Sequence, residues 1–260
     1  MPTEAYLAEQ LAPVDPQRIH AARHAMLVQL AGALRADWEW AFEAHQVAGP
    51  YTPDPISAGK RALANRALAM LCLDAVASGD PVWPGRTYQR FKDAAHMTDR
   101  LGALTALVRS HAQHAEPALH RFYEMFRGEP LVIDTWFALQ AGAPEVDGKV
   151  YARVKQLLKH ADFSIRNPNR ARSLLSAFCS GNPGAFHRAD AAGYVFWAEQ
   201  VMALDAINPQ LAARLARMLD RWSQLAEPYR GAARVAIARV AAKPDLSANV
   251  REIVSNALGQ

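Results

Sequence analysis

The stretch from Phe163 to His187 reads FSIRNPNRARSLLSAFCSGNPGAFH, and it holds two Asn-Pro pairs and a cluster of arginines in twenty-five residues. In Asn167-Pro168, the Asn side chain can accept hydrogen bonds from the free N–H groups of a first helical turn. Pro suits the first helical position because its missing N–H would have no helical partner anyway. The pattern predicts a turn, a helix that begins at Pro168, and a second turn at Asn182-Pro183.

Arg170 falls in the first turn of this predicted helix. A positive charge at the positive end of the helix dipole costs about 0.3–1 kcal/mol, so another interaction must offset it. An ion pair with an acidic neighbour is the favoured interpretation. The alternative is that Arg166, Arg170 and the helix N-terminus together face an anion such as a peptide carboxylate.

The composition is that of a folded globular protein. Of the 260 residues, 51% are hydrophobic and 21% are charged, which is unlike a disordered chain. The net charge is +4, but the basic residues are spread over many predicted helix faces and form no block and no groove with interleaved aromatic residues. We therefore expect no nucleic-acid partner.

The cysteines and the hydropathy pattern indicate a cytoplasmic protein. Cys72 and Cys179 both lie in apolar helical patterns, which predicts two buried thiols in a reducing compartment and no disulfide. No apolar run reaches the roughly eighteen residues of a membrane helix, and the first residues, MPTEAYLAEQ, do not have the pattern of a secretory signal. We expect no membrane partner.

A Pro-rich stretch gives the clearest internal boundary. From Pro16 to about His45 an apolar residue recurs every three or four positions, which predicts one long amphipathic helix or two in near continuity. Residues 49–55, GPYTPDP, cannot be helical because three prolines in six residues remove N–H donors. We predict N-terminal helices in residues 1–48, a linker or loop in 49–56 and the main helical segment in 57–260, all within one continuous domain, 1–260.

The rest of the chain also has helical spacing. The segment LVIDTWFALQA opens like a strand, but Trp136, Phe137 and Leu139 continue at helical spacing, so we predict a helix. About twelve helices joined by short turns make antiparallel neighbours that stack into an α-solenoid. No repeat of fixed length is present, so the predicted fold is all-α, an irregular superhelix.

The residues themselves offer no convincing catalytic centre. His20 and His24 have the i, i+4 spacing of a zinc helix, but Ala21 stands where the general-base Glu belongs, and we interpret both as exposed helix histidines. There is no G-x-S-x-G, P-loop, G-x-G-x-x-G or C-x-x-C motif. An aromatic set is interpreted as core: Trp136, Phe137, Phe178, Phe186, Tyr194, Phe196 and Trp197.

An ordered set of segments resembles the C-terminal helical domain of the bacterial aminopeptidase N family, and the match covers nearly the whole chain. These segments are Thr3-Glu4-Ala5, His96-Met97-Thr98-Asp99, Pro130 to Asp134 with Trp136 to Ala141, Phe163 to Phe178 with its NPNR, Asn182-Pro183 with Ala185-Phe186-His187, Gly193-Tyr194, and Asn208-Pro209-Gln210 with Ala213-Arg214.

The resemblance implies a part of a gluzincin zinc metallo-aminopeptidase, which removes N-terminal residues from peptides. The zinc and the HExxH motif of that family belong to a catalytic domain upstream, so no catalytic residue, metal ligand or cofactor is implied here, and this segment alone is expected to be inactive. The resemblance implies a domain that closes over the active-site cavity, with the upstream catalytic domain and the peptide substrate as partners. Asn167, Asn169 and Arg170 match positions expected to bind the peptide.

A different class of function stays open at this level. The chain could be a stand-alone helical scaffold that binds peptides or protein partners on its concave face. A lid domain binds the catalytic portion through a large interface, whereas a scaffold ignores it. We prefer the interpretation as a segment of a longer polypeptide, since a lid has little use without an enzyme to cover.

Overall fold

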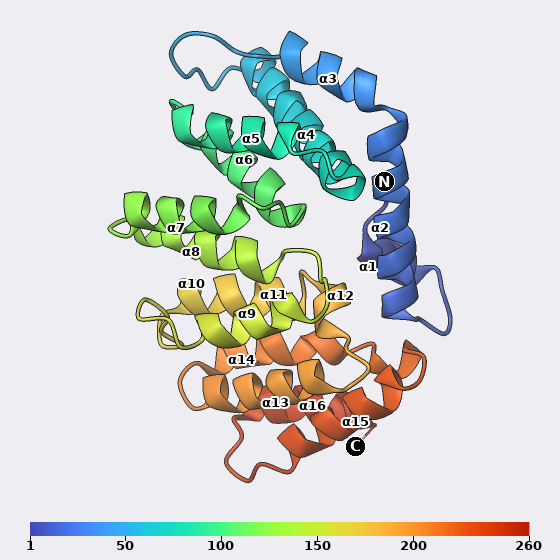
Figure 1. Ribbon diagram of the computed structural model, residues 1–260. Helices are drawn as coiled ribbons and strands as arrows, with labels where there is room; N and C mark the ends of the chain where they lie inside the picture. Colours follow the sequence, from blue (N-terminus) through green and yellow to red (C-terminus); the bar gives the residue numbers. More distant parts are fainter. Residues whose placement is uncertain (260) are drawn as a thin grey trace. The chain divides into compact units, whose positions relative to one another are not determined.

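A computed structural model describes residues 1–259, and these form helices joined by turns (Figure 1). The extended residues that pair within this range do so in one isolated parallel bridge, between Val14 and Leu225. The predicted all-α class is confirmed. The segment from Pro130 to Ala141, which could have opened as a strand, is a helix as predicted.

Two compact units divide the chain. Residues Arg23–Glu129 form one unit, and Met1–Ala22 forms the other together with the chain from Pro130 onward. We call them the middle unit and the terminal unit. The predicted division into 1–48, 49–56 and 57–260 stays a prediction.

The middle unit holds most of α2 and the helices that follow it. The first seven helices of the chain are α1 Glu4–Glu9, α2 Pro16–Ala33, α3 Arg35–Ala44, α4 Pro55–Ser78, α5 Val82–Asp93, α6 Met97–Arg109 and α7 Ala115–Phe126. The near continuity of α2 and α3 was predicted. The long helix α4 contacts α3, α5 and α6 and is the centre of this unit. It begins where the Asp54 side chain accepts a hydrogen bond from the N–H of Ser57 (2.9 Å), and it ends at Gly79, whose φ of 76° is in the left-handed region that glycine adopts without strain.

The terminal unit contains α1 and the helices after Pro130. These are α8 Pro130–Ala141, α9 Lys149–Leu157, α10 Pro168–Ala171, α11 Ala177–Cys179, α12 Pro183–Phe186, α13 Ala192–Asp205, α14 Pro209–Ala216, α15 Tyr229–Ala241 and α16 Ala248–Leu258. The last four pack on one another, α13 against α14 and α15, and α16 against α14 and α15. The predicted aromatic core is confirmed, since all seven of its side chains are buried.

The helix that begins at Pro168 is not regular throughout. Between α10 and α11 the residues Arg172–Ser176 form a π-helical segment, which the sequence did not predict. Such segments are rare and are often found at functional sites. The helix therefore carries an irregular turn directly after the NPNR residues.

Candidate functional site

The NPNR turn has the cap that the sequence predicted. The Asn167 Oδ1 accepts hydrogen bonds from the backbone N–H groups of Asn169 (3.0 Å) and Arg170 (3.2 Å). Two otherwise free N–H groups of the first helical turn are thereby satisfied. The Asn167 and Asn169 residues are exposed, so this turn presents both of them on the surface of the terminal unit.

Arg170 points inward instead. It is 6% exposed, and its Nε lies 2.5 Å from the Oδ1 of Asp134 on α8. Its guanidinium also donates to the carbonyl of Asp162 and lies 4.9 Å from the centre of the Phe137 ring. The favoured interpretation of Arg170, an ion pair with an acidic neighbour, is therefore confirmed. The pair joins two segments of the family resemblance, the NPNR turn and the helix PLVIDTWFALQA.

The second Asn-Pro pair, Asn182-Pro183, also begins a helix with a capping asparagine, but here the asparagine is buried. The Asn182 Oδ1 accepts a hydrogen bond from the N–H of Ala185 (3.3 Å), as a helix cap does. Its Nδ2 donates to the carbonyl oxygens of Ala141 (2.9 Å) and Ala143 (2.6 Å) at the end of α8. Both Asn-Pro pairs thus begin helices. The contacts to α8 come from Asn182 in the second pair and from Arg170, which follows the first pair.

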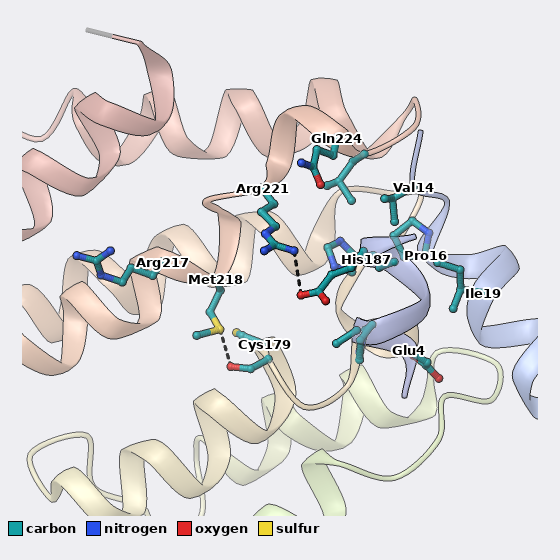
Figure 2. A pocket seen from close by; sticks show the side chains of 16 residues that line it. Glu4, Val14, Pro16, Ile19, Cys179, His187, Arg217, Met218, Arg221 and Gln224 are labelled. Atoms are coloured by element: carbon teal, nitrogen blue, oxygen red, sulfur yellow. Dashed lines mark hydrogen bonds and ion pairs between the residues drawn. The ribbon is translucent and has the colours of Figure 1, made fainter. Parts of the chain in front are cut away.

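A pocket of about 330 Å³ lies in the terminal unit next to the second pair (Figure 2). Its lining comes from α1, the start of α2, the chain around α11 and α12, and residues 217–225. Most of the lining surface is apolar, and its residues include Val14, Ile19, Pro183, Met218 and Leu225. A volume of this size is at the lower end of those that hold small ligands.

The N-terminal residues are fastened to this unit by backbone and side-chain hydrogen bonds. The N–H of Val14 donates to the carbonyl of Gln224 (2.8 Å), and the N–H of Ala226 donates to the carbonyl of Val14 (2.7 Å). The Gln17 amide donates to the carbonyl oxygens of Gly184 (2.8 Å) and His187 (2.7 Å). One wall of the pocket is therefore held in place by contacts between distant parts of the sequence.

The charged groups at the pocket are already paired. Glu9 and Arg221 form an ion pair of 3.0 Å that is visible in Figure 2, and Glu4 lies 3.0 Å from the Nδ1 of His20. His20 is thus half-buried because α1 folds back over α2, and His24 is half-buried too, so the interpretation of both as exposed helix histidines was wrong. An acidic helix α1 supplies the partner that the local sequence of α2 does not contain.

The titratable groups deeper in the pocket are held neutral. Burial lowers the pKa of His187 to about 4, although the nearby Glu4 charge opposes the shift, and its Nδ1 lies 2.8 Å from the Tyr194 hydroxyl. Burial raises the pKa of the Cys179 thiol far above its usual value, so the thiol stays protonated at neutral pH. The pocket can hold an apolar group, but its histidine and its thiol are not an activated nucleophile and base.

Both cysteines are free and buried, as predicted. Burial also raises the pKa of Cys72 to about 11. Within the described range, residues 1–259, no group of three or more His, Cys, Asp or Glu side chains is placed to hold a metal ion. Over that same range no helix is long and apolar enough to cross a membrane.

Sequence reasoning found the NPNR turn and missed the pocket. The Asn-Pro pairs have a local signal, because a capping side chain acts within three residues of its own position. The pocket depends on Val14 meeting Gln224, two residues that are far apart in the chain and have no motif in common. Of the lining residues, Pro16 and Pro183 stand at positions where the sequence has a recognisable local signal, the start of a helix and an Asn-Pro pair.

Comparisons with known proteins agree with the resemblance. A family model described as "Domain of unknown function (DUF3458_C) ARM repeats" matches residues 1–259. The chain is 37% identical over 259 residues to aminopeptidase N of Caulobacter vibrioides, covering 100% of this chain and 29% of that protein. It is 32% identical over 258 residues to aminopeptidase N of Escherichia coli, covering 99% of this chain and again 29% of that protein.

A solved structure has the same fold. The crystal structure of Legionella pneumophila aminopeptidase A in complex with aspartic acid matches with a TM-score of 0.86 and 26% sequence identity, over 100% of this chain and 30% of that one. The chain therefore spans less than a third of the length of these relatives. The similarity to the C-terminal domain of aminopeptidase N is confirmed, and the ARM-repeat description fits the predicted α-solenoid.

Proposed function

The chain belongs to the DUF3458_C family of ARM repeats, and from that premise we propose that it is the C-terminal helical part of a zinc aminopeptidase. The observation that carries the proposal is the match of the entire chain, at 37% identity, to 29% of an aminopeptidase N. The zinc and the catalytic groups would then lie in an upstream domain of the same polypeptide, and this part alone would be inactive.

In this proposal the helical part closes over the active-site cavity and positions the peptide. The NPNR turn supports such a role because it combines a fixed backbone with exposed polar side chains. Arg170 holds the turn through Asp134, and Asn167 caps it, so the exposed Asn169 is presented in one orientation. Asn169 would contact the peptide directly, Asn167 would order the turn that carries it, and Arg170 would act by fixing the turn to α8.

Two buried free thiols support a reducing, cytoplasmic setting for the enzyme. Buried thiols in a small oxidised protein would more often be paired. The peptide substrate and the upstream catalytic domain are the partners that the proposal requires.

Reading the gene upstream of residue 1 is the direct test. A reading frame that continues for several hundred codons and encodes HExxH with a downstream Glu is the expected result. An in-frame stop codon close upstream would contradict the proposal and favour a stand-alone scaffold.

A second test uses proteins rather than genes. The chain would be mixed with an aminopeptidase N from which the matching C-terminal part has been deleted, and release of the N-terminal residue from a tetrapeptide and from a long unfolded polypeptide would be followed. We expect no release by the chain alone, and in the mixture a rise in the ratio of tetrapeptide to polypeptide cleavage. Asn169→Ala should weaken the effect on the tetrapeptide, whereas Asn256→Ala, on the remote helix α16, serves as the matched control.

A further inference from the structure

Two motifs that the sequence singled out meet in the middle unit. The Pro-rich stretch 49–55 runs past the N-terminus of α6, where the His96-Met97-Thr98-Asp99 segment lies. The rings of Tyr51 and His96 are 5.1 Å apart between centres. Arg61 of α4 lies under the same stretch, with its guanidinium 4.5 Å from the centre of the Tyr51 ring.

Arg61 is one of the most buried charged residues of the chain. It is 2% exposed, and its Nη2 donates to the backbone carbonyl of Thr52 (2.5 Å). Its Nη1 is also buried, and in residues 1–259 it has no hydrogen-bond partner. No acidic side chain within that range forms an ion pair with Arg61.

A guanidinium that is buried without a charged partner is stabilised when a counter-ion binds to it. Arginine keeps its charge at all accessible pH values, so it cannot relieve the cost of burial by losing a proton. Buried charges in proteins are paired with an opposite charge as a rule, and a buried donor without a partner loses its bonds to water without replacement. A carbonyl oxygen and an aromatic face compensate the charge only in part.

The acidic residues nearby are engaged elsewhere. The Asp99 Oδ2 lies 3.0 Å from the Nη2 of Arg90 and 3.4 Å from the Nε2 of His96. Asp54 caps α4 and accepts a further hydrogen bond from the hydroxyl of Thr52. Neither carboxylate is paired with Arg61, so within residues 1–259 the guanidinium has no counter-ion.

The segment that lies over Arg61, residues 49–54, buries little of its own surface. Every residue from 49 to 56 is exposed, and Tyr51, which lies against the guanidinium, is 52% exposed. A segment with little buried surface opens at low cost in free energy. Movement of this segment would expose one edge of the guanidinium, with both N–H groups of Nη1 and the second N–H of Nη2 available.

We propose that Arg61 is the recognition group of an oxyanion site beneath residues 49–54. The planar edge formed by Nη1 and Nη2 matches two oxygens of a carboxylate or a phosphate, which arginine binds through two parallel hydrogen bonds. The anion supplies the negative charge that Arg61 does not have in its own chain. The edge favours oxyanions because each of two oxygens accepts one straight hydrogen bond, whereas a spherical ion such as chloride must accept both bonds at a single atom with bent geometry.

Thermal unfolding of the 260-residue chain in sodium acetate, sodium phosphate or sodium chloride, all at one ionic strength, tests this site. At about 50 mM anion we expect the unfolding midpoint to rise by about 2–4 °C in acetate or phosphate relative to chloride. A shift in acetate alone identifies a carboxylate site, and a shift in phosphate alone identifies a phosphate site. Equal midpoints in all three salts would overturn the proposal.

Variants separate the site from general effects of salt. Arg61→Met should abolish the shift, while Arg66→Met, which removes an exposed arginine one turn further along α4, should keep it. Tyr51→Ala removes the ring that lies against the guanidinium and leaves Arg61 in place, so it should enlarge the anion-dependent rise in the unfolding midpoint. This variant tests the site even if Arg61→Met does not fold. A shift that survives Arg61→Met, or that Tyr51→Ala leaves unchanged, would overturn the proposal.

Discussion

Arg170 in the terminal unit and Arg61 in the middle unit are both almost fully buried, at 6% and 2% exposed, but within residues 1–259 only Arg170 has a carboxylate partner. Arg170 forms an ion pair with Asp134, whereas Arg61 contacts a carbonyl oxygen and an aromatic ring. The difference shows that a buried arginine can have either of two roles. The first arginine joins two helices, and the second is left with binding capacity that its own chain does not use.

The largest expected effect comes from breaking the complete pair. Asp134→Ala leaves the Arg170 guanidinium buried without its counter-charge, and we expect it to lower the free energy of unfolding by about 3–5 kcal/mol. Urea unfolding followed by circular dichroism measures this loss. Glu124→Ala is the control, because Glu124 is exposed and its carboxylate lies 3.7 Å from the Nη1 of Arg127, so the change should cost less than about 1 kcal/mol. Similar losses in the two variants would contradict the structural role of the Arg170 pair.

His187 is a buried base that, unlike the two buried arginines, can lose its charge. Its folded pKa of about 4 lies below the unfolded value of 6.5, so between these values the unfolded chain binds a proton that the folded chain does not. The free energy of unfolding should therefore be constant above pH 6.5 with respect to this group and fall by about 2–3 kcal/mol as the pH drops to 4.

Urea midpoints at pH 7, 5.5 and 4.5 measure this dependence. His187→Gln should remove most of the loss between pH 7 and 4.5, and the exposed His120→Gln should leave it in place. An unchanged pH profile in His187→Gln would show that other groups titrate in this window.

The two Asn-Pro caps allow the same comparison for neutral side chains, between a buried asparagine with several partners and an exposed one that only caps a helix. Asn182 is buried and makes three hydrogen bonds, and Asn182→Ala should cost about 2–3 kcal/mol because two carbonyl oxygens of the α8 end also lose their donor. Asn167 is exposed and acts only as a cap, so Asn167→Ala should cost about 1 kcal/mol. Thermal unfolding of both variants measures the ratio, and equal losses would mean that the bonds from Asn182 to α8 contribute nothing.

The smallest effect is expected at Arg61. Arg61→Met should change the free energy of unfolding by less than about 1 kcal/mol. The substitution removes a buried charge that has no ionic partner, so no carboxylate loses its counter-charge. Arg170→Met is the matched change and should cost about 3 kcal/mol, because it leaves the half-buried Asp134 with an unpaired charge. If both variants lose the same stability in urea, the contrast between the two arginines is wrong.

The local features of the chain were largely predictable. The start of the helix at Pro168, the near continuity of α2 and α3 and the helix from Pro130 follow from caps, prolines and apolar spacing. The stretch 49–55 is non-helical as predicted only up to Asp54, because Pro55 takes the first position of α4, which proline tolerates. Each of these signals acts over a few residues. The π-helical turn at Arg172–Ser176 was not predictable from them, because nothing in its composition distinguishes it from an ordinary helical turn.

By itself the sequence determined the helical class, the buried thiols and the family, since these depend on periodicity, residue type and an ordered set of motifs. Only the tertiary structure decided what the charged residues do. Arg170 pairs with Asp134 and His20 pairs with Glu4, whereas Arg61 has no acidic partner among the residues that the structure describes. The physical reason is that an ion pair depends on a distance of a few ångströms between side chains that lie up to dozens of residues apart, and local sequence does not determine that distance.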